Sequence, residues 1–292
     1  MVAVTQFNLD ESTPSPDQLW SSGSQESKSK FELGASPRLV GGTTFANKAP
    51  LDQQQVKLLT HAAIKSMEET RKTLTRWRRQ GQSLADIYLY AITQSARLIG
   101  EMWSADELDF INTTISLSRL HRVMHEFSPE FLSEASSESN GLSLLIMTEP
   151  ASQHGLGAFM LSEFFRHAGW RVVLVSPQDM EDFKRVFLSD WFDAVMLSIS
   201  TDRHIDAVAN EVAELRQAAV NQNLKIYVGG PMAKISPDAL KWPGTSLLFT
   251  DAAQTVEAVT QDMQNKARLS ALPPSKNEHS NNNDKLNQVT KM

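Results

Sequence analysis

The most restrictive feature of the sequence is an alternation of short apolar runs and amphipathic stretches that begins near residue 141. The runs are continuously apolar, which is typical of parallel strands buried on both faces of a sheet. Each run is followed by a stretch in which apolar residues recur with helical spacing. The five runs are LSLLIMT (142–148), RVVLVS (171–176), AVMLSIS (194–200), KIYVGG (225–230) and TSLLFT (245–250).

Five strand–helix units predict an α/β fold with a doubly wound, parallel five-stranded sheet. The flavodoxin-like strand order 2-1-3-4-5 is the expected arrangement for such a chain. The helices are expected at AFMLSEFFRHAG (158–169), DMEDFKRVFLS (179–189), HIDAVANEVAELRQAAVNQ (204–222), SPDALK (236–241) and AAQTVEAVTQDMQNKA (252–267).

The preceding block, from about 53 to 136, has apolar residues at intervals of three and four and predicts a small antiparallel helical bundle. Gly81-Gln82-Ser83 is expected to end the first helix, with Ser83 as the N-cap of the second. Ser104 and Glu107 have the spacing of a capping box that would begin the third helix. A shorter fourth helix is expected at 128–136.

Both ends of the chain are rich in Ser, Pro, Asn and charged residues. Such segments bury too little apolar surface to offset the entropy lost on ordering, so both are predicted to be disordered. The expected organisation is a tail at 1–50, a helical bundle at 51–137, a flavodoxin-like domain at 138–268 and a tail at 269–292.

Charge and composition exclude several classes of function. The formal net charge is −6 and the isoelectric point is about 5.7, so direct nucleic acid binding through a broad basic surface is not expected. Cysteine is absent, which excludes disulfides and thiolate chemistry. No apolar run approaches the ~18 residues of a membrane span, so we expect a cytoplasmic protein with no membrane contact.

Unusual residues follow three of the predicted strands. In an open α/β sheet, ligands bind beyond the carboxyl ends of the strands, where the strand order reverses. No glycine pattern of a dinucleotide or triphosphate site is present. The residues at this edge include a histidine beside glycines, a hydroxyl cluster and a double glycine: Ser152, Gln153, His154, Gly155, Leu156, Gly157, Ser198, Ile199, Ser200, Gly229 and Gly230.

These three elements resemble the cobalamin-binding signature of corrinoid proteins and methionine synthase, which is Asp-x-His-x-x-Gly, then Ser-x-Leu, then Gly-Gly. The gaps between them are close to those of the family. The resemblance implies that His154 replaces the dimethylbenzimidazole base as the lower axial ligand of cobalt. It also implies that the freed nucleotide tail enters beside Ser198 and passes Gly229 and Gly230. Imidazole in its neutral form is a suitable ligand for cobalt.

The chain departs from this signature at two positions. Ser152 stands where the family has the aspartate that orients the histidine, and Ser200 replaces the leucine. A weaker or more switchable axial bond is expected, because carboxylates behind a ligand raise its basicity. Glu149 is interpreted as a solvated loop residue, with a substitute role for the missing aspartate as the alternative. Heme stays open as an alternative cofactor, since a histidine on this scaffold could also hold iron.

The helical block resembles the cap that covers the upper face of the corrinoid in methionine synthase and in light-responsive cobalamin regulators. Trp103 would lie over the cobalt at the start of a cap helix, followed by Thr113, Thr114 and Leu117; packing of Trp103 inside the bundle is the alternative. His121 and His125, four residues apart, are interpreted as a solvated pair, with approach of one of them to the upper cobalt face as the alternative. The basic run at 71–79 is interpreted as an exposed helix face, or as a docking patch for an acidic partner.

The whole organisation resembles the PpaA/AerR antirepressors of photosynthetic purple bacteria, over roughly residues 53–266. The resemblance implies a light-responsive regulator without enzymatic activity that binds hydroxo- or aquocobalamin. Its implied partner is a DNA-binding repressor of the PpsR/CrtJ type that controls photosynthesis genes. Two other functions stay open, a corrinoid carrier subunit of a methyltransferase and a heme sensor on the same scaffold.

Overall fold

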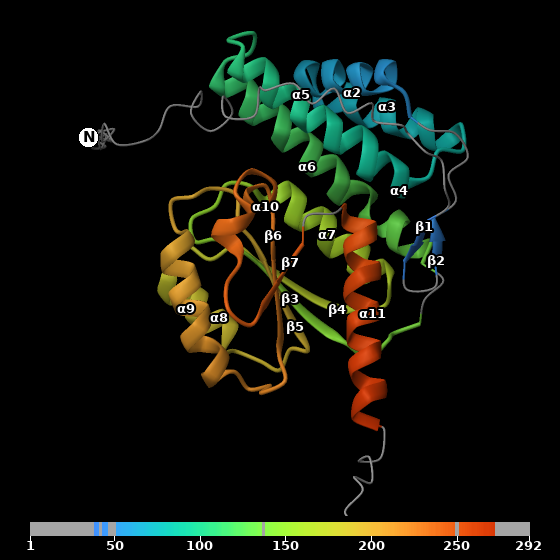
Figure 1. The fold of residues 1–292 in the computed structure, drawn as a ribbon. Coiled ribbons are helices and arrows are strands. Elements are labelled where there is room, and N and C mark those ends of the chain that lie inside the picture. The colour runs from blue at the N-terminus through green and yellow to red at the C-terminus, as the bar shows by residue number, and fades with distance from the viewer. Residues whose placement is uncertain (1–37, 41–42, 46–50, 136–137, 249–250, 272–292) are drawn as a thin grey trace, which may run out of the picture.

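The computed structural model describes residues 38–40, 43–45, 51–135, 138–248 and 251–271 (Figure 1). A block of helices lies over one end of an α/β unit. Most of the two predicted tails falls outside the described residues, so their disorder stays a prediction.

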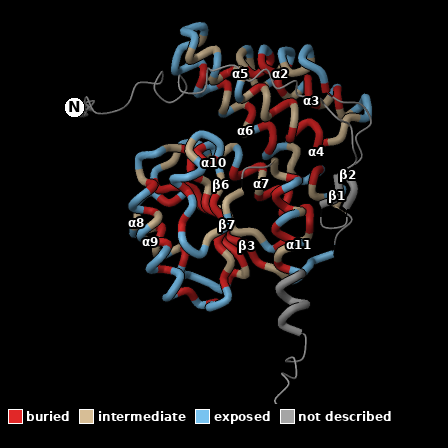
Figure 2. The backbone as a smooth tube through the Cα atoms, viewed as in Figure 1, coloured by how far each residue is buried: buried red, intermediate tan, exposed pale blue. Residues whose placement is uncertain are grey.

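The α/β unit has the predicted topology. Its five strands are all parallel and lie in the order β4-β3-β5-β6-β7, which is 2-1-3-4-5 in the order of the chain. The flavodoxin-like fold is therefore confirmed. Strand β3 is buried along its whole length (Figure 2). The bounds are β3 (Ser143–Thr148), β4 (Arg171–Val175), β5 (Ala194–Ser198), β6 (Lys225–Gly229) and β7 (Thr245–Leu247).

The helices of this unit cover both faces of the sheet, as expected for a doubly wound fold. The predicted helix at 158–169 begins earlier, directly after His154. The predicted helix at 236–241 is a short 3-10 helix, preceded by a single helical turn that the sequence pattern did not indicate. The bounds are α7 (Gly155–His167), α8 (Met180–Phe187), α9 (Ile205–Ala218), α10 (Met232–Ile235), the 3-10 helix η3 (Pro237–Leu240) and α11 (Ala252–Ala271).

The two faces of the sheet belong to two separate hydrophobic cores. Alternate residues of β3 point to opposite faces, so Leu144 and Ile146 pack in one core while Leu145 and Met147 pack in the other. The first core contains residues of α7 and α11 and continues into the helical block. The second core is formed with α8 and α9.

The helical block is a bundle, as predicted, but its helices divide differently. Ser66 has an extended backbone and separates two helices where one was expected. Ser83 caps the next helix, as predicted, through a hydrogen bond of 3.0 Å from the backbone N–H of Asp86. The bounds are α2 (Gln53–Lys65), α3 (Met67–Arg79), α4 (Leu84–Asp86), the π-helix η2 (Ile87–Ile92), α5 (Thr93–Ser104) and α6 (Phe110–Ser133).

Two predictions about this block are wrong. Ser104 does not begin a helix but ends α5, and its hydroxyl donates to the carbonyl oxygen of Gly100 at 3.0 Å. The next helix begins after Asp109, whose carboxylate accepts the backbone N–H of Asn112 at 2.7 Å. No separate helix occupies 128–136, because α6 continues through Pro129 to Ser133.

Aromatic packing joins the bundle to the α/β unit. The ring centroid of Phe131 on α6 lies 5.1 Å from that of Phe164 and 4.8 Å from that of His167, both on α7. Tyr88 of η2 also packs against Phe131, with ring centroids 5.1 Å apart. The hydroxyl of Thr93 contacts the sulfur of Met160 at 3.6 Å. Helix α7 is therefore the element through which the bundle and the sheet are connected.

Part of the segment predicted as an N-terminal tail has regular structure. Strands β1 (Arg38–Val40) and β2 (Thr43–Phe45) form an antiparallel hairpin. The hairpin lies beside α11 (Figure 1). For the rest of residues 1–50 the tail stays a prediction. Across the described part of the chain, no helix combines the length and the apolar character needed to cross a membrane.

Candidate functional site

The carboxyl ends of three strands meet at one edge of the sheet, which we call the carboxyl edge. Thr148 at the end of β3 is paired with Ser198 of β5, and Ser198 is paired with Gly229 of β6. The segments that follow these strands therefore lie next to one another. This is the juxtaposition that the sequence pattern led us to expect.

His154 occupies the position immediately before α7, where it is the N-cap residue. The residue is exposed, and its ring makes no hydrogen bond within the described residues. Its backbone N–H donates to the hydroxyl oxygen of Ser152 at 3.3 Å. The imidazole is thus presented at the carboxyl edge on a fixed piece of backbone and keeps its ring nitrogens for another partner.

The residues next to His154 differ in burial: some are exposed, and one packs against the core. Gln153 is exposed, and its side-chain amide donates to the carbonyl oxygen of Ala151 at 3.5 Å. Leu156 is half-buried and packs against the first core. Gly155 is half-buried and Gly157 is exposed, and neither carries a side chain that would cover the surface beside His154.

Glu149, the residue after β3, is buried at 3% exposed, so its interpretation as a solvated loop residue is wrong. One carboxylate oxygen accepts the hydroxyl of Ser152 at 3.1 Å, and the other accepts the backbone N–H of Ser200 at 3.0 Å. Its own N–H donates to the carbonyl oxygen of Ser198 at 3.2 Å. A signal for this burial was its position directly after a continuously apolar run.

The double glycine at the end of β6 is required by the close approach of neighbouring backbone segments. Gly230 has a φ of +94°, and a Cβ there would lie 2.6 Å from the carbonyl oxygen of Ile199 and 3.0 Å from the hydroxyl of Ser198. A Cβ on Gly229 would lie 3.0 Å from the carbonyl oxygen of Leu248. Ile199, expected beside a cofactor, is buried at 1% exposed and packs in the second core.

Two buried hydroxyls at this edge have no hydrogen-bond partner among the described residues. They are Oγ1 of Thr148 and Oγ of Ser200, whose residues are 1% and 9% exposed. A buried polar group without a partner costs about 1–3 kcal/mol, so such groups call for a partner. The arrangement fits a polar ligand that enters between the ends of β3 and β5.

Helix α6 brings two further histidines to the same place. The ring of His125 stacks on Phe159 of α7 at 3.8 Å between centroids, and the ring of His121 lies 5.2 Å from that of Phe159. A Cβ on Gly155 would lie 3.7 Å from Cε1 of His121, so His121 lies close to the residue that follows His154. The sequence pattern gave no signal for this contact, which depends on how α6 crosses α7.

The interpretation of the two histidines as a solvated pair is therefore wrong for His121. Its Nε2 is buried without a hydrogen-bond partner among the described residues. Burial, and next the proximity of His125, lowers the pKa of His121, so its neutral form is favoured. His125 is exposed beside it. The described residues contain no cluster of three or more side chains of the kind that binds a metal ion without a cofactor.

The other residues expected in the cap are distributed over two sides of the bundle. Trp103 lies in the last turn of α5 rather than at the start of a helix, and its ring is 6.4 Å from that of the exposed Phe110. Leu117 is half-buried and precedes His121 by one turn, so the two share a side of α6. Thr114 is exposed, whereas Thr113 is buried at 6% exposed.

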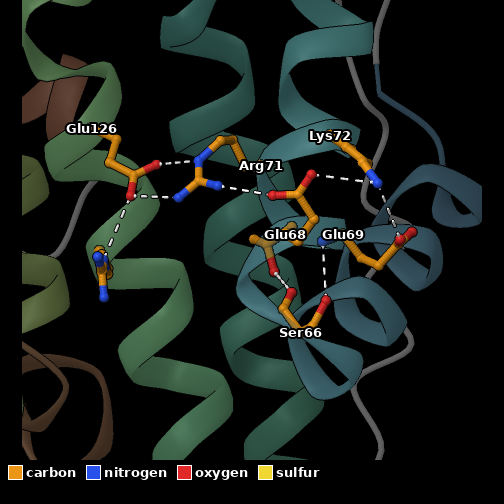
Figure 3. Close-up of polar contacts among 8 residues, drawn as sticks. Ser66, Glu68, Glu69, Arg71, Lys72 and Glu126 are labelled. Carbon is orange, nitrogen blue, oxygen red and sulfur yellow. Dashed lines mark hydrogen bonds and ion pairs between the residues drawn. The ribbon is translucent and has the colours of Figure 1, made fainter.

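The basic run at 71–79 forms one face of α3, and part of it is used inside the bundle. Arg71 donates to Glu126 of α6 at 2.7 Å and to Glu68 at 3.0 Å, and Lys72 lies 3.4 Å from Glu68 (Figure 3). Arg78 pairs with Glu130 of α6 and with Glu134, the C-cap residue of that helix. An open hollow on α3 includes the same Arg71 and Lys72, and its lining is Arg71, Lys72, Thr75, Arg76, Arg79 and Gln80.

Comparison with known proteins gives a match for the α/β unit. Residues 143–260 match the family described as B12 binding domain. This range contains the three elements of the carboxyl edge, which were singled out from the sequence.

One curated relative and one solved structure extend the comparison. The chain is 26% identical over 165 residues to a 20.5 kDa protein of Rhodobacter capsulatus from the bchF-crtJ intergenic region; the match covers 56% of this chain and 85% of the relative. The monomethylamine corrinoid protein of Methanosarcina barkeri superposes with a TM-score of 0.59 at 13% identity. That match covers 72% of this chain and 99% of the other, and it concerns the fold alone.

Proposed function

We propose that this chain binds cobalamin at the carboxyl edge and acts as a regulator rather than as an enzyme, because residues 143–260 match the B12 binding domain family. The observation that carries the proposal is the free imidazole of His154, presented beside buried hydroxyls that have no partner among the described residues. A flat macrocycle with a metal centre and a polar side arm provides a metal for the imidazole and polar atoms for the hydroxyls.

Each part of the edge has its own task in this proposal. His154 would hold the cobalt through a ring nitrogen of neutral imidazole, the form able to ligate a metal. Thr148, Ser198 and Ser200 line the entry of the nucleotide arm between the ends of β3 and β5. Gly229 and Gly230 keep that entry free of side chains. The cobalt of a bound cobalamin supplies a centre whose axial ligands can be exchanged.

The bundle would cover a corrinoid bound at the carboxyl edge. Leu117 and His121 lie on the side of α6 that approaches α7, and His121 lies close to Gly155. Trp103 and Thr114 are assigned to the rim of this cover. Thr113 lies one turn before Leu117 on α6, and its buried hydroxyl has no hydrogen-bond partner among the described residues, so it is assigned to the same cover. The neutral state of His121, favoured by its burial, avoids placing a positive charge next to the ligand.

The regulatory part of the proposal is supported by likeness to the PpaA/AerR antirepressors. The Rhodobacter capsulatus relative is named for the interval between bchF and crtJ. By extension, the partner of this chain is a DNA-binding repressor of the PpsR/CrtJ type, and the signal is light acting on hydroxo- or aquocobalamin. The net charge of −6 is in keeping with control through such a partner rather than through direct contact with DNA.

A corrinoid carrier is the second candidate, because the likeness to the Methanosarcina barkeri corrinoid protein extends over 99% of that chain. A carrier would accept a methyl group from a methylated substrate when a methyltransferase is present. Methyl transfer to the cob(I)alamin form, followed by its absorption change, separates the two candidates. The regulator reading predicts no turnover above a His154→Ala control.

The cofactor is tested by absorption spectroscopy of the full chain. Purified protein is mixed with hydroxocobalamin or with hemin, and spectra are recorded in darkness and after illumination. We expect a stoichiometric spectral shift with hydroxocobalamin and none with hemin. A shift with hemin alone would overturn the proposal in favour of a heme sensor. The partner is tested by co-elution with a PpsR/CrtJ-type repressor, compared between cobalamin-loaded and cobalamin-free protein. Equal co-elution in the two states would overturn the regulatory part of the proposal.

A further inference from the structure

We propose that Glu149 is a positioning residue for the axial histidine, and that it acts through the hydroxyl of Ser152. The loop concerned is residues 149–154, called the His154 loop below. The inference rests on the proposed function, since it assumes that His154 ligates cobalt.

The first observation is the environment of the carboxylate. Glu149 is buried at 3% exposed and forms no ion pair with any Lys, Arg or His of the described residues. Burying a carboxylate without a cation is unfavourable unless hydrogen bonds to the charged form compensate. Glu149 accepts two such bonds, from Ser152 and from Ser200. The unfavourable free energy of burying this carboxylate suggests that it has a function.

The second observation is what those two bonds connect. Ser200 follows β5, while Ser152 lies in the loop after β3. The carboxylate therefore links neighbouring segments at the carboxyl edge. Its backbone N–H adds a third link, to the carbonyl oxygen of Ser198 at 3.2 Å.

The third observation is the path from Glu149 to His154. The hydroxyl of Ser152 donates to Glu149 at 3.1 Å, and the same oxygen accepts the backbone N–H of His154 at 3.3 Å. Ala151, between them, has a φ of +58°, a conformation that non-glycine residues rarely adopt. A loop with such a residue needs contacts that hold it in place. The backbone N–H of Ala151 donates to the carbonyl oxygen of Pro177 at 2.9 Å, and that of Ser152 donates to the carbonyl oxygen of Glu149 at 3.2 Å. The side-chain pair of Glu149 and Ser152 adds the contact that reaches the N–H of His154.

The consequence concerns the geometry of the axial bond. The ring of His154 has no hydrogen-bond partner among the described residues, so its direction is set by its backbone. That backbone is held by Ser152, and Ser152 is held by Glu149. Loss of either side chain should leave His154 chemically intact but free to leave the metal.

The test uses the full chain loaded with cob(II)alamin. Electron paramagnetic resonance reports the fraction of cobalt with an axial nitrogen, and a titration reports affinity. Glu149→Gln keeps the size of the side chain and an acceptor oxygen for the backbone N–H of Ser200. Its amide group is a donor and faces the hydroxyl of Ser152, which then loses the carboxylate as its acceptor. We expect a clear loss of the axial-nitrogen signal and an affinity lowered by about 10-fold or more, as for other groups that orient metal ligands.

Substitutions of Ser152 separate positioning from folding. Ser152→Ala removes the hydroxyl and should reproduce the effect of Glu149→Gln. Ser152→Thr retains the hydroxyl and should restore the axial signal. The double variant Glu149→Gln with Ser152→Ala should be no worse than either single variant, because both act on one link.

The matched control is Glu163→Gln. Glu163 is also a buried glutamate, at 1% exposed, but it lies on α7 and binds Arg166 at 2.8 Å. This variant should keep the axial nitrogen and the affinity of the unmodified protein. Should Glu149→Gln fail to fold by circular dichroism, the Ser152→Ala and Ser152→Thr pair decides the question.

The outcomes distinguish this inference from the proposed function. An axial nitrogen in the unmodified protein that persists undiminished in Glu149→Gln or in Ser152→Ala would overturn the role of Glu149 alone. An unmodified protein that binds no cobalamin, or binds it without an axial nitrogen from His154, would overturn both.

Discussion

The two faces of the sheet differ in what covers them. On one face the core is completed by α8 and α9, with Phe183 and Phe187 fully or almost fully buried. On the other face the core passes from the sheet through α7 into the bundle, where Phe131 and Tyr88 continue it. One face is thus closed within the α/β unit itself, whereas the other is shared with the helices that precede it.

The bundle therefore supports the helix that carries the site, in addition to covering it. Helix α7 begins next to His154 and packs on two sides. Phe165 faces Trp170 at 5.3 Å between ring centroids, while Phe164 faces Phe131 of the bundle at 5.1 Å. A movement of α6 against α7 would therefore change the surroundings of His154 directly.

The largest effect should come from removing the bundle. A fragment of residues 138–271 would expose Phe159, Met160 and Phe164, which are at most 6% exposed in the whole chain. Each of these side chains contributes roughly 1.5–3 kcal/mol when fully buried. We expect the fragment to unfold at clearly lower denaturant and to bind a hydrophobic dye. Loaded with cobalamin, it should react with cyanide faster than the full chain; equal stability and equal reactivity would contradict a shared core.

A smaller effect is expected from one side chain of the shared core. Phe131→Ala should cost about 3–5 kcal/mol of unfolding free energy, and Phe183→Ala in the second core should cost about as much. Both residues are fully buried. Only Phe131→Ala should also speed the release of cobalamin, because only Phe131 contacts α7. Equal release rates in the two variants, measured by competition, would remove the distinction between the faces.

The pH dependence should come from the shared face. Burial lowers the pKa of His167, which packs against Phe131, and also that of His121. The unfolded chain then binds protons more readily than the folded chain below about pH 6.5. The unfolding free energy should therefore fall as the pH decreases through this value towards the lowered pKa, and stay level above it. His167→Leu should flatten the curve measured by denaturant titration; an unchanged slope would contradict this assignment.

The smallest effect is expected on the outer side of the bundle. Arg78 pairs with Glu130 and Glu134 near the surface and donates to the carbonyl oxygen of Gln82 at 2.6 Å. Arg78→Met should cost about 0–1 kcal/mol, and high salt should reduce the difference. Arg76→Met, on the same helix, is the control and should change stability less. A loss as large as that of Phe131→Ala would mean that ion pairs, not the apolar core, hold the bundle together.

Much of the fold could be predicted from local patterns. Continuous apolar runs located all five strands, and the flavodoxin-like order followed from general rules of α/β sheets. The division of the bundle could not be predicted in the same way. Ser66 interrupts a helical pattern without a Gly or Pro, and Pro129 lies inside a helix that continues past it. The break at Ser66 is a local N-cap, because its hydroxyl accepts the backbone N–H of Glu69 at 3.1 Å. At Pro129, by contrast, packing within the bundle outweighed the local signal.

The site shows the same boundary between local and distant information. His154 and the glycines were found because each follows a predicted strand. The burial of Glu149 depends on the backbone N–H of Ser200, which lies in another strand-end segment. The place of His121 depends on the crossing of α6 over α7. Contacts of this kind have no periodic signature in a single sequence.

The most direct measurement is electron paramagnetic resonance of cob(II)alamin bound to protein whose histidines carry nitrogen-15. The two nitrogen isotopes have different nuclear spins, so the splitting by the axial nitrogen identifies its source. We expect the splitting of nitrogen-15 from the labelled histidine, and its loss in His154→Ala. A nitrogen-14 pattern, from the dimethylbenzimidazole of the cofactor, would contradict it.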